Sequence, residues 1–213
     1  FSGKKLIHVS CEHKNTEILK DLLINFNDKI DINSFDKNYD TPLHLACENG
    51  NIEIIDTLFK YCKQEIKLNI KNKKGKTPIM MGCLSKKIKN RLNIIQQIYN
   101  FVKTEENKIE LINLKGPLNK TLLHMACENK EITIVRFLIS LPGININAVD
   151  NDNRTALMSS IFYGFDDITK LLLNHHDIDI NIRDNNNKTA YDIAVGRSLD
   201  NEIMQIFHSK IKK

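Results

Sequence analysis

The chain has 213 residues, of which 41% are hydrophobic, 27% charged and 7% aromatic, which is enough apolar content for a sizeable core. No stretch approaches the ~18 uninterrupted apolar residues of a membrane span, so we expect a soluble chain with no membrane insertion. The formal net charge of +5 is well below the basic excess of a dedicated DNA-binding domain, so charge alone does not identify a partner.

One motif recurs in phase along the whole chain. Its copies begin near Lys5 (KLIHVSC), Thr41 (TPLHLACENG), Thr77 (TPIMMGC), Thr121 (TLLHMACENK), Thr155 (TALMSSI) and Thr189 (TAYDIAV). Successive starts are 36, 36, 44, 34 and 34 residues apart. The sequence therefore predicts a repeat protein with a period of about 33 residues and some insertions.

Each copy of the motif predicts a helix that is followed by a second helix. A Thr at the start suits a helix N-cap, and Pro42 and Pro78 follow at the first helical position, where a missing N–H costs nothing. Apolar residues at i, i+3 and i+4 then predict second helices over residues 52–59, 132–139 and 168–173. An Ile-Asn or Leu-Asn pair and a polar turn follow, so the predicted unit is helix, loop, helix and turn.

The motif TPLHLA of Thr41–Ala46, with TLLHMA at Thr121–Ala126, resembles the signature of the ankyrin repeat family. The resemblance implies an all-α solenoid of stacked helix pairs with β-turn fingers, about six repeats in a single domain over residues 1–213. It also implies a role in binding other proteins. In the last copy, Asp192 replaces the family's usual His and the second helix, predicted at residues 202–208, is short, as in a terminal capping unit. We expect the chain to be part of a longer protein.

The turns before each Thr depart from the family pattern, which usually has a glycine there. Only Gly75 keeps it, while Asn119, Asn153 and Asn187 take the equivalent places. Asn is the next best residue for a left-handed backbone, so these turns are predicted to have positive φ. Tyr39, at the same place in the second copy, is an unusual residue for such a turn.

Histidines and cysteines recur in the motif, and we predict structural roles for them. The resemblance implies that His8, His44 and His124 hydrogen-bond to the finger backbone and to the motif Thr. Cysteines 11, 47, 83 and 127 share one motif position and are predicted to be buried and reduced, since consecutive repeats are too far apart for a disulfide. The five cysteines form no CxxC pair, which favours a reducing, cytoplasmic compartment.

The rest of the sequence contains no motif typical of a catalytic, nucleotide-binding or metal site. Residues 175–177, His-His-Asp, are adjacent in sequence with no second ligand group nearby, and a loop role is favoured over a metal site. No P-loop, GxGxxG turn, GxSxG elbow or HExxH helix occurs. We therefore expect no enzyme, no catalytic residues, no cofactor and no metal.

Partner binding is predicted on the fingers and the exposed face of the first helices, which form a concave groove in the family. The candidate partner-binding residues are Glu48, Asn49, Lys73, Lys74, Lys76, Leu84, Leu118, Lys120, Glu128, Asn129, Asp152, Arg154, Phe162 and Tyr163. Phe162 and Tyr163 beside Arg154 have the make-up of an interaction hot spot. The alternative is that Phe162 packs into the adjacent repeat.

The leading hypothesis is a monomeric, non-catalytic module that binds a protein or peptide of unknown identity. The alternative is electrostatic binding of an anionic lipid headgroup or nucleic acid through the third repeat, whose finger contains Lys71, Lys73, Lys74 and Lys76. Insertions at residues 86–91 and 104–110 of this repeat are predicted to be loops. A third hypothesis is a scaffold attached to a catalytic domain elsewhere in a longer chain.

Overall fold

The computed structural model describes residues 3–62, 65–87, 89, 91–197 and 199–211, which form helices and loops. Among these residues the only β-type pairing is an isolated bridge between Val149 and Thr155. The predicted all-α architecture is therefore confirmed. The helices gather into two compact units, Phe1–Pro117 and Leu118–Lys213, and each is described by itself. A single domain over residues 1–213 stays a prediction.

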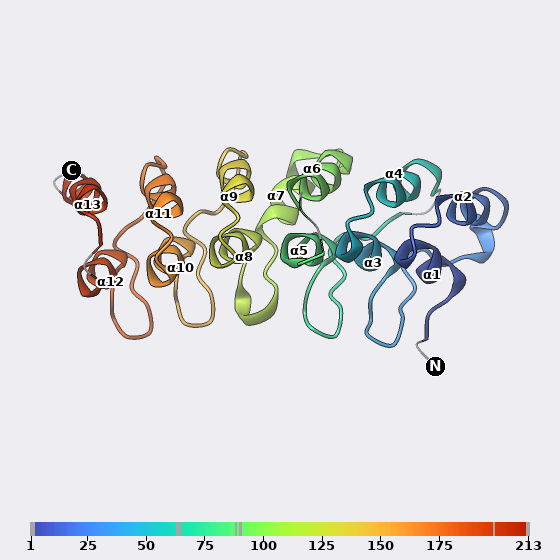
Figure 1. Cartoon of the computed structure of the whole chain (residues 1–213), viewed down its shortest axis with the longest axis horizontal. Helices are drawn as coiled ribbons and strands as arrows, with labels where there is room; N and C mark the ends of the chain where they lie inside the picture. Colours follow the sequence, from blue (N-terminus) through green and yellow to red (C-terminus); the bar gives the residue numbers. More distant parts are fainter. Residues whose placement is uncertain (1–2, 63–64, 88, 90, 198, 212–213) are drawn as a thin grey trace. The chain divides into compact units, whose positions relative to one another are not determined.

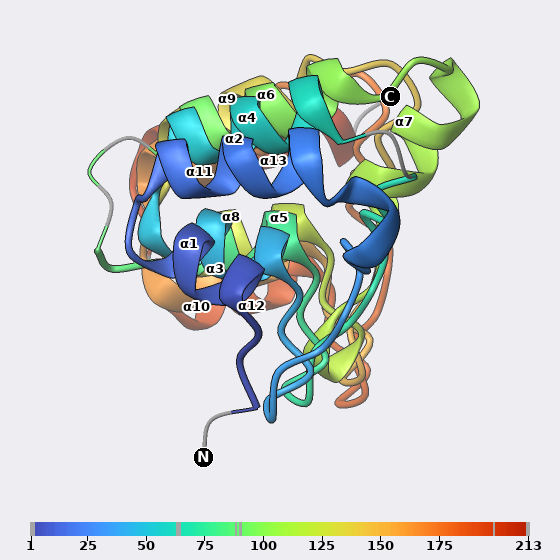
Figure 2. The same cartoon turned by 90° about the vertical axis from the view of Figure 1, so that its right-hand side faces the viewer.

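Among its described residues, the first unit has three helix pairs and one additional α-helix. The first helices of its repeats are α1 (Leu6–Glu12), α3 (Pro42–Asn49) and α5 (Pro78–Leu84), and the second helices are α2 (Thr16–Asn25), α4 (Ile52–Tyr61) and α6 (Arg91–Phe101). A short 3-10 helix, η1 (Asn27–Lys29), follows α2. Within this unit the first helices form one row and the second helices another (Figure 1). The loops that lead into α3 and α5 project to one side of the first-helix row (Figure 2), and these loops are the fingers.

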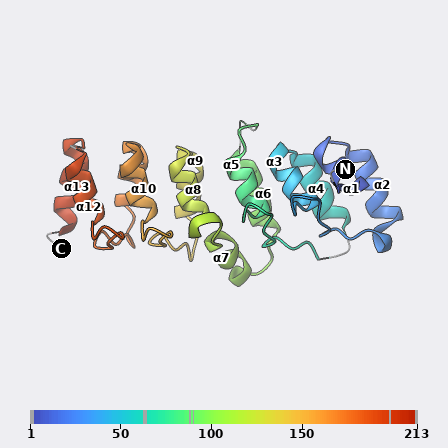
Figure 3. The ribbon, with the colours of Figure 1, turned by 90° about the horizontal axis from the view of Figure 1, so that it is seen from below.

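The second unit repeats this plan. Its first helices are α8 (Leu122–Glu128), α10 (Ala156–Tyr163) and α12 (Ala190–Gly196), and its second helices are α9 (Ile132–Ile139), α11 (Asp166–Leu173) and α13 (Asn201–Ile211). A 3-10 turn, η2 (Pro117–Asn119), precedes α8. Viewed from below, α8 lies with α9, and α10 with α11 (Figure 3). The last second helix is longer than predicted, because α13 continues to Ile211.

One predicted loop is a helix. The insertion expected at residues 104–110 forms α7 (Glu105–Asn113), so that prediction is wrong. The side chain of Thr104 caps it by accepting the N–H of Asn107 at 3.3 Å, and Glu105 and Glu106 in the first turn suit the positive end of the helix dipole. Leu111 and Ile112 are buried and anchor it. In the other insertion, Ile88 and Asn90 lie outside the described residues.

Each unit has its own apolar core between its two rows of helices. In the first unit Ile55, Leu58 and Ile95 of the second helices are fully buried, as are Val135 and Leu172 in the second. Each such side chain contributes about 1.5–3 kcal/mol by leaving water. The predicted second helices at 52–59, 132–139 and 168–173 all lie within α4, α9 and α11. The 3.6-residue apolar pattern therefore located the core correctly.

The motif Thr and His form one hydrogen-bonded unit, shown by Thr41 and His44. The Thr41 hydroxyl caps α3 by accepting the His44 N–H at 3.4 Å, while the ring Nδ1 of His44 accepts the Thr41 backbone N–H at 3.1 Å and lies 2.8 Å from its hydroxyl. Because Nδ1 accepts, the other ring nitrogen, Nε2, carries the proton and donates to the carbonyl of Lys76 at 3.0 Å. The ring thus ties helix α3 to the next finger.

His124 and His8 repeat this arrangement. Nδ1 of His124 accepts the Thr121 N–H at 3.3 Å and its Nε2 donates to the Arg154 carbonyl at 3.0 Å. Nε2 of His8 lies 3.0 Å from the carbonyl of Ser34. Burial lowers the pKa of all three rings, which favours the neutral form that this bonding requires. The structural role that the resemblance implied is confirmed for His44 and His124, whereas His8 bonds to the finger carbonyls and accepts the N–H of Lys5, since its copy has no Thr.

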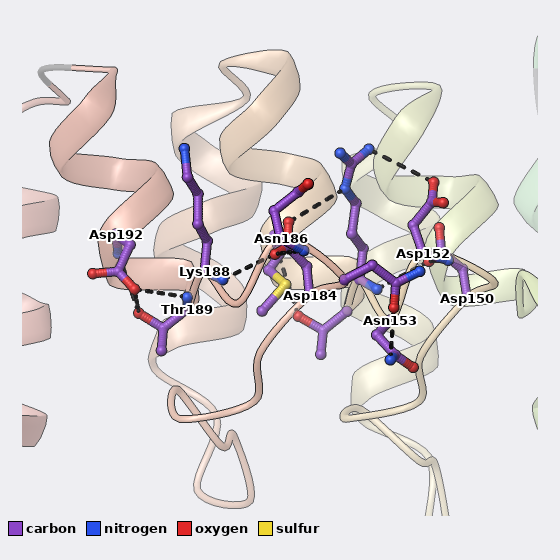
Figure 4. A network of polar contacts seen from close by, with 12 residues as sticks. Asp150, Asp152, Asn153, Asp184, Asn186, Lys188, Thr189 and Asp192 are labelled. Carbon is purple, nitrogen blue, oxygen red and sulfur yellow. Dashed lines mark hydrogen bonds and ion pairs between the residues drawn. The ribbon is translucent and has the colours of Figure 1, made fainter.

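The fingers have the predicted left-handed turns. Positive φ occurs at Gly75 (71°) and at Asn119, Asn153 and Asn187 (57°, 56° and 60°), and Tyr39 adopts it as well, at 60°. Carboxylate and amide side chains close the turns: Asp150, for example, accepts the backbone N–H groups of the residues two and four positions later, both at 2.9 Å. Asp184 accepts two N–H groups of its own finger in the same way (Figure 4).

Candidate protein-binding surface

Half of the predicted partner-binding residues lie together around one small pocket in the second unit. The pocket has a volume of about 100 Å³ and is lined by Leu118, Lys120, Glu128, Asp150, Asn151, Asp152, Arg154, Ser159, Phe162 and Tyr163. The fingers that precede α8 and α10 supply part of the lining, and residues of these two helices supply the rest. The pocket therefore lies between fingers and first helices, where the sequence placed the binding surface. We refer to these ten residues as the second-unit pocket.

Backbone hydrogen bonds hold the fingers of this unit edge to edge. The N–H of Asn151 donates to the carbonyl of Leu118 at 3.0 Å, and the N–H of Asn185 donates to the carbonyl of Asp152 at 2.9 Å. Side chains add further links, such as the Asn153 amide to Asn185 at 2.9 Å. Figure 4 shows this region between Asp150 and Asp192. Fingers fixed in this way lose little conformational entropy when a partner binds.

Phe162 and Tyr163 form the aromatic part of the second-unit pocket. They are the last two residues of α10, which ends at Gly164 with a left-handed φ of 71°. Their side chains stay 49% and 47% exposed, and their rings meet edge to face at 5.4 Å. Tyr163 also stacks on Phe165 at 5.9 Å. Phe162 is therefore not buried in an adjacent repeat, and the alternative considered from the sequence is wrong.

The charged lining divides into paired and loosely paired groups. Lys120 and Glu128 form a close ion pair at 2.6 Å, with side chains 20% and 17% exposed. Arg154 lies 3.9 Å from the carboxylates of both Asp152 and Asp184, beyond hydrogen-bond distance. Lys120 and Glu128 are therefore committed to each other, whereas the guanidinium of Arg154 keeps donors available.

The other predicted residues do not line this pocket. Asn129 is exposed and donates to the carbonyl of Met125 at 2.8 Å, so its amide serves the end of α8. The remaining ones belong to the first unit: Glu48, Asn49 and Leu84 are partly buried, Lys73 and Lys74 are exposed and Lys76 is partly buried. The side chain of Asn49 accepts a hydrogen bond from Lys87 at 3.1 Å.

An aromatic pair in the first unit escaped the sequence analysis. Phe35 and Tyr39 flank the turn of the first finger, are 48% and 52% exposed and meet edge to face at 5.7 Å. The ammonium group of Lys73, on the next finger, lies 5.0 Å from the centre of the Tyr39 ring. The sequence carries a signal for this pair, since Phe35 and Tyr39 stand on either side of the turn residue Asp36.

The motif cysteines are part of the core. Cys11, Cys47, Cys83 and Cys127 are fully buried, as the repeat predicted. Burial raises the pKa of Cys11 and Cys47, which keeps their thiols protonated and unreactive. These side chains have the environment of small hydrophobic residues rather than of nucleophiles.

The His-His-Asp segment is built into its own loop. The ring of His175 donates from Nε2 to the carbonyl of Ile139 at 3.2 Å, and its Nδ1 accepts the Asp177 N–H at 3.2 Å. His176 lies 3.0 Å from the Asp177 carboxylate. Both ring nitrogens of His175 are therefore engaged in holding the loop.

No helix within the described residues is long and apolar enough to cross a membrane.

Comparison with known proteins decides the family. The family model for ankyrin repeats (3 copies) matches residues 6–107, 87–184 and 123–207. The chain belongs to the ankyrin repeat family. The fold and the family that the repeated motif indicated are thereby confirmed. The hydrogen bonds between the motif Thr and His lie within ankyrin repeats.

Individual relatives match different shares of the chain. SMC5-SMC6 complex localization factor protein 1 of Homo sapiens is 46% identical over 52 residues, which are 24% of this chain and 5% of that protein. The ankyrin repeat domain of Bcl-3, a member of the IkappaB family, has a TM-score of 0.81 at 17% identity and covers 97% of this chain and 82% of that one.

A further similar structure is that of the Bd0816 predatory endopeptidase from Bdellovibrio bacteriovorus in complex with the immunity protein Bd3460. Its TM-score is 0.67 at 20% identity, with 92% of this chain and 93% of that one covered. At such identities the structural matches show the ankyrin fold and nothing more. The chain spans only a small part of the human relative, so that protein's role does not carry over.

Proposed function

We propose that this chain is a non-catalytic protein-interaction module that binds a protein or peptide through the second-unit pocket. The observation that carries the proposal is the half-exposed pair Phe162 and Tyr163 beside fingers that are already fixed by backbone hydrogen bonds. Exposed aromatics on a preorganised surface are the typical centre of an interaction hot spot. Ankyrin repeats are generally protein-binding, and one similar structure is a protein complex. We further propose that the module acts as a monomer in a reducing compartment.

Capture of partners by two matched double variants tests the site. Replacing Phe162 and Tyr163 with Ala should abolish most partner capture, measured by affinity pull-down and quantitative mass spectrometry against the unaltered chain. The control is Phe35→Ala with Tyr39→Ala, which removes a similarly exposed aromatic pair from the first unit. Circular dichroism checks that both variants keep their helices. If the control loses the partners and the Phe162 and Tyr163 variant retains them, the proposed site is wrong.

A second candidate function rests on the first unit. There Lys71, Lys73 and Lys74 are exposed on one finger beside the Phe35 and Tyr39 rings. The nearby carboxylate of Asp36 is buried, and its Oδ1 accepts two N–H groups of its own turn. Cations among exposed aromatics suit an anionic polymer such as single-stranded nucleic acid.

Charge reversal tests the second candidate. Changing Lys73, Lys74 and Lys76 to Glu should remove salt-dependent retention on heparin and on single-stranded DNA, if that surface binds polyanions. The matched control reverses Lys20, Lys29 and Lys60, which are exposed in the same unit. Retention that is equal for the two triple variants excludes the finger as a specific polyanion site.

A further inference from the structure

Three cations at the edge of the second-unit pocket lie against aromatic rings. The guanidinium carbon of Arg154 is 5.4 Å and that of Arg197 is 5.9 Å from the centre of the Phe162 ring. The ammonium group of Lys130 lies 5.7 Å from the centre of the Phe165 ring, on which Tyr163 stacks. Two helix ends and one finger thus bring three positive charges to one aromatic cluster, Phe162, Tyr163 and Phe165.

Two of these cations have no carboxylate partner among the described residues, and Arg154 is paired only loosely. Neither Lys130 nor Arg197 forms an ion pair with another residue that the structure describes, and both are exposed. Arg154 approaches Asp152 and Asp184 only to 3.9 Å. A cation over a ring is held there by attraction to the π face and still has its hydrogen-bond donors available. The guanidinium groups are therefore oriented and able to accept an anion from outside.

The negative charges of the pocket restrict what that anion can belong to. Glu128 is committed to Lys120 at 2.6 Å, and the Asp150 carboxylate is turned into its own finger, but the side chain of Asp152 is 65% exposed. A continuous polyphosphate crossing the pocket would meet Asp152 and Glu128 at close range. A peptide with one or two carboxylates placed opposite the arginines avoids this repulsion.

We propose that the second-unit pocket recognises an acidic peptide segment, in which an Asp or Glu side chain lies between Arg154 and Arg197 and an adjacent apolar side chain packs on Phe162 and Tyr163. This inference rests on the proposed function and specifies the chemistry of its ligand. Guanidinium groups bind carboxylates through paired N–H donors, which gives geometric selectivity as well as attraction. The exposed ring faces supply the apolar burial. Recognition is therefore carried jointly by charge and aromatic surface.

A phage-displayed library of random 12-residue peptides provides the probe. The full chain is immobilised, the library is selected at low salt, and the selected peptides are sequenced. We expect enrichment of Asp or Glu next to an apolar residue, and affinity of a synthetic selected peptide that falls as salt rises. Selection of peptides without acidic residues would overturn the inference. An oligonucleotide of single-stranded DNA that binds at the same residues more tightly than the selected peptide would overturn it as well.

Single substitutions then assign the binding residues. Arg154→Gln and Arg197→Gln should each weaken a selected acidic peptide about tenfold, as loss of one charge-assisted contact does. Arg136→Gln, which removes an exposed arginine from α9 in the same unit, is the matched control and should leave affinity unchanged. Arg197 is exposed at the end of α12, so its substitution tests the idea even if Arg154→Gln alters the finger.

Different outcomes contradict the proposed function of the pocket and its proposed preference for acidic peptides. If Phe162→Ala abolishes binding while both arginine variants bind normally, the pocket binds peptides but not through carboxylates, and the further inference is wrong. If Phe162→Ala binds normally as well, the proposed function at this pocket is wrong. Affinities are measured by fluorescence anisotropy with a labelled peptide, and thermal unfolding confirms that each variant is folded.

Discussion

The hydroxyl group of the motif Thr is hydrogen-bonded in some repeats and not in others. Thr41 and Thr121 share hydrogen bonds with His44 and His124, but in the third repeat Met80 takes the place of His. The hydroxyl of Thr77 is buried and has no hydrogen-bond partner among the described residues. A thioether offers no ring nitrogen to accept from it, so this repeat carries a buried unsatisfied group.

Two Thr→Val substitutions test that difference. Thr77→Val should leave the free energy of unfolding unchanged or raise it, because it removes an unsatisfied hydroxyl at nearly constant volume. Thr41→Val should lower it by about 1–3 kcal/mol, because the His44 backbone N–H and the His44 ring Nδ1 both lose the hydroxyl group that they contact. Both values come from urea unfolding followed by circular dichroism. Equal losses in the two variants would mean that the Thr77 hydroxyl is bonded after all.

The neutral motif histidines make stability depend on pH. Their folded-state pKa values are lowered by burial, so their contribution is complete above the unfolded-state value of about 6.5 and is lost as pH falls below it. We expect the melting temperature to fall between pH 7 and pH 5. Replacing His44 and His124 with Gln should reduce this fall, whereas His176→Gln, at an exposed ring, should not. A melting temperature that rises on acidification contradicts this interpretation.

At the scale of helices, glycines mark where packing is closest. A Cβ at Gly82, in α5, would lie 2.9 Å from Cγ2 of the buried Ile94 in α6, closer than real Cβ contacts. A Cβ at Gly196, in α12, would meet no atom within 4 Å. An added Cβ would therefore be crowded in α5 and unobstructed in α12, although both are first helices of their repeats.

Gly→Ala changes at these two positions should have opposite effects. Gly196→Ala should raise the free energy of unfolding by up to about 1 kcal/mol, the helix preference of Ala over Gly. Gly82→Ala should lower it, because displacing Ile94 in a close-packed core outweighs that preference. Chemical unfolding of both variants measures the difference. A stabilised Gly82→Ala chain would show that the α5 and α6 contact can relax without loss.

The sequence predicted the elements better than it predicted the site. Helix starts at Pro42 and Pro78 and the turns at Asn153 and Asn187 follow from local chemistry, and the structure has them in place. Helix α7 was missed because an insertion has no counterpart in the repeat. The phase of the repeat placed Phe162 near the fingers, but the approach of Arg197 to its ring depends on a contact between successive repeats that no local pattern contains.

At the scale of the whole molecule, each compact unit has a complete core of its own. The second unit contains α8 to α13, its own buried apolar residues and the entire pocket. Stability in repeat proteins is the sum of repeat terms and of interfaces between neighbours, and a stable fold needs at least three repeats, the number that the second unit contains. The function proposed for the pocket therefore requires only the second unit.

A fragment of residues 115–213 tests that independence. We expect it to be helical by circular dichroism, to unfold cooperatively, and to bind selected peptides within about threefold of the full chain's affinity. Its melting temperature should be lower than that of the full chain, because fewer neighbouring repeats contribute. A fragment without cooperative unfolding would show that the second unit needs the first to fold.

The way α10 ends separates folding from recognition. Residues 156–161 of this helix are all buried, and then Phe162 and Tyr163 turn to solvent just before Gly164 reverses the chain. Substitutions in the first six positions alter the core, whereas substitutions in the last two alter only what the surface presents. The partner selectivity proposed for this chain would therefore depend on two half-exposed positions of a helix whose other residues are committed to the core.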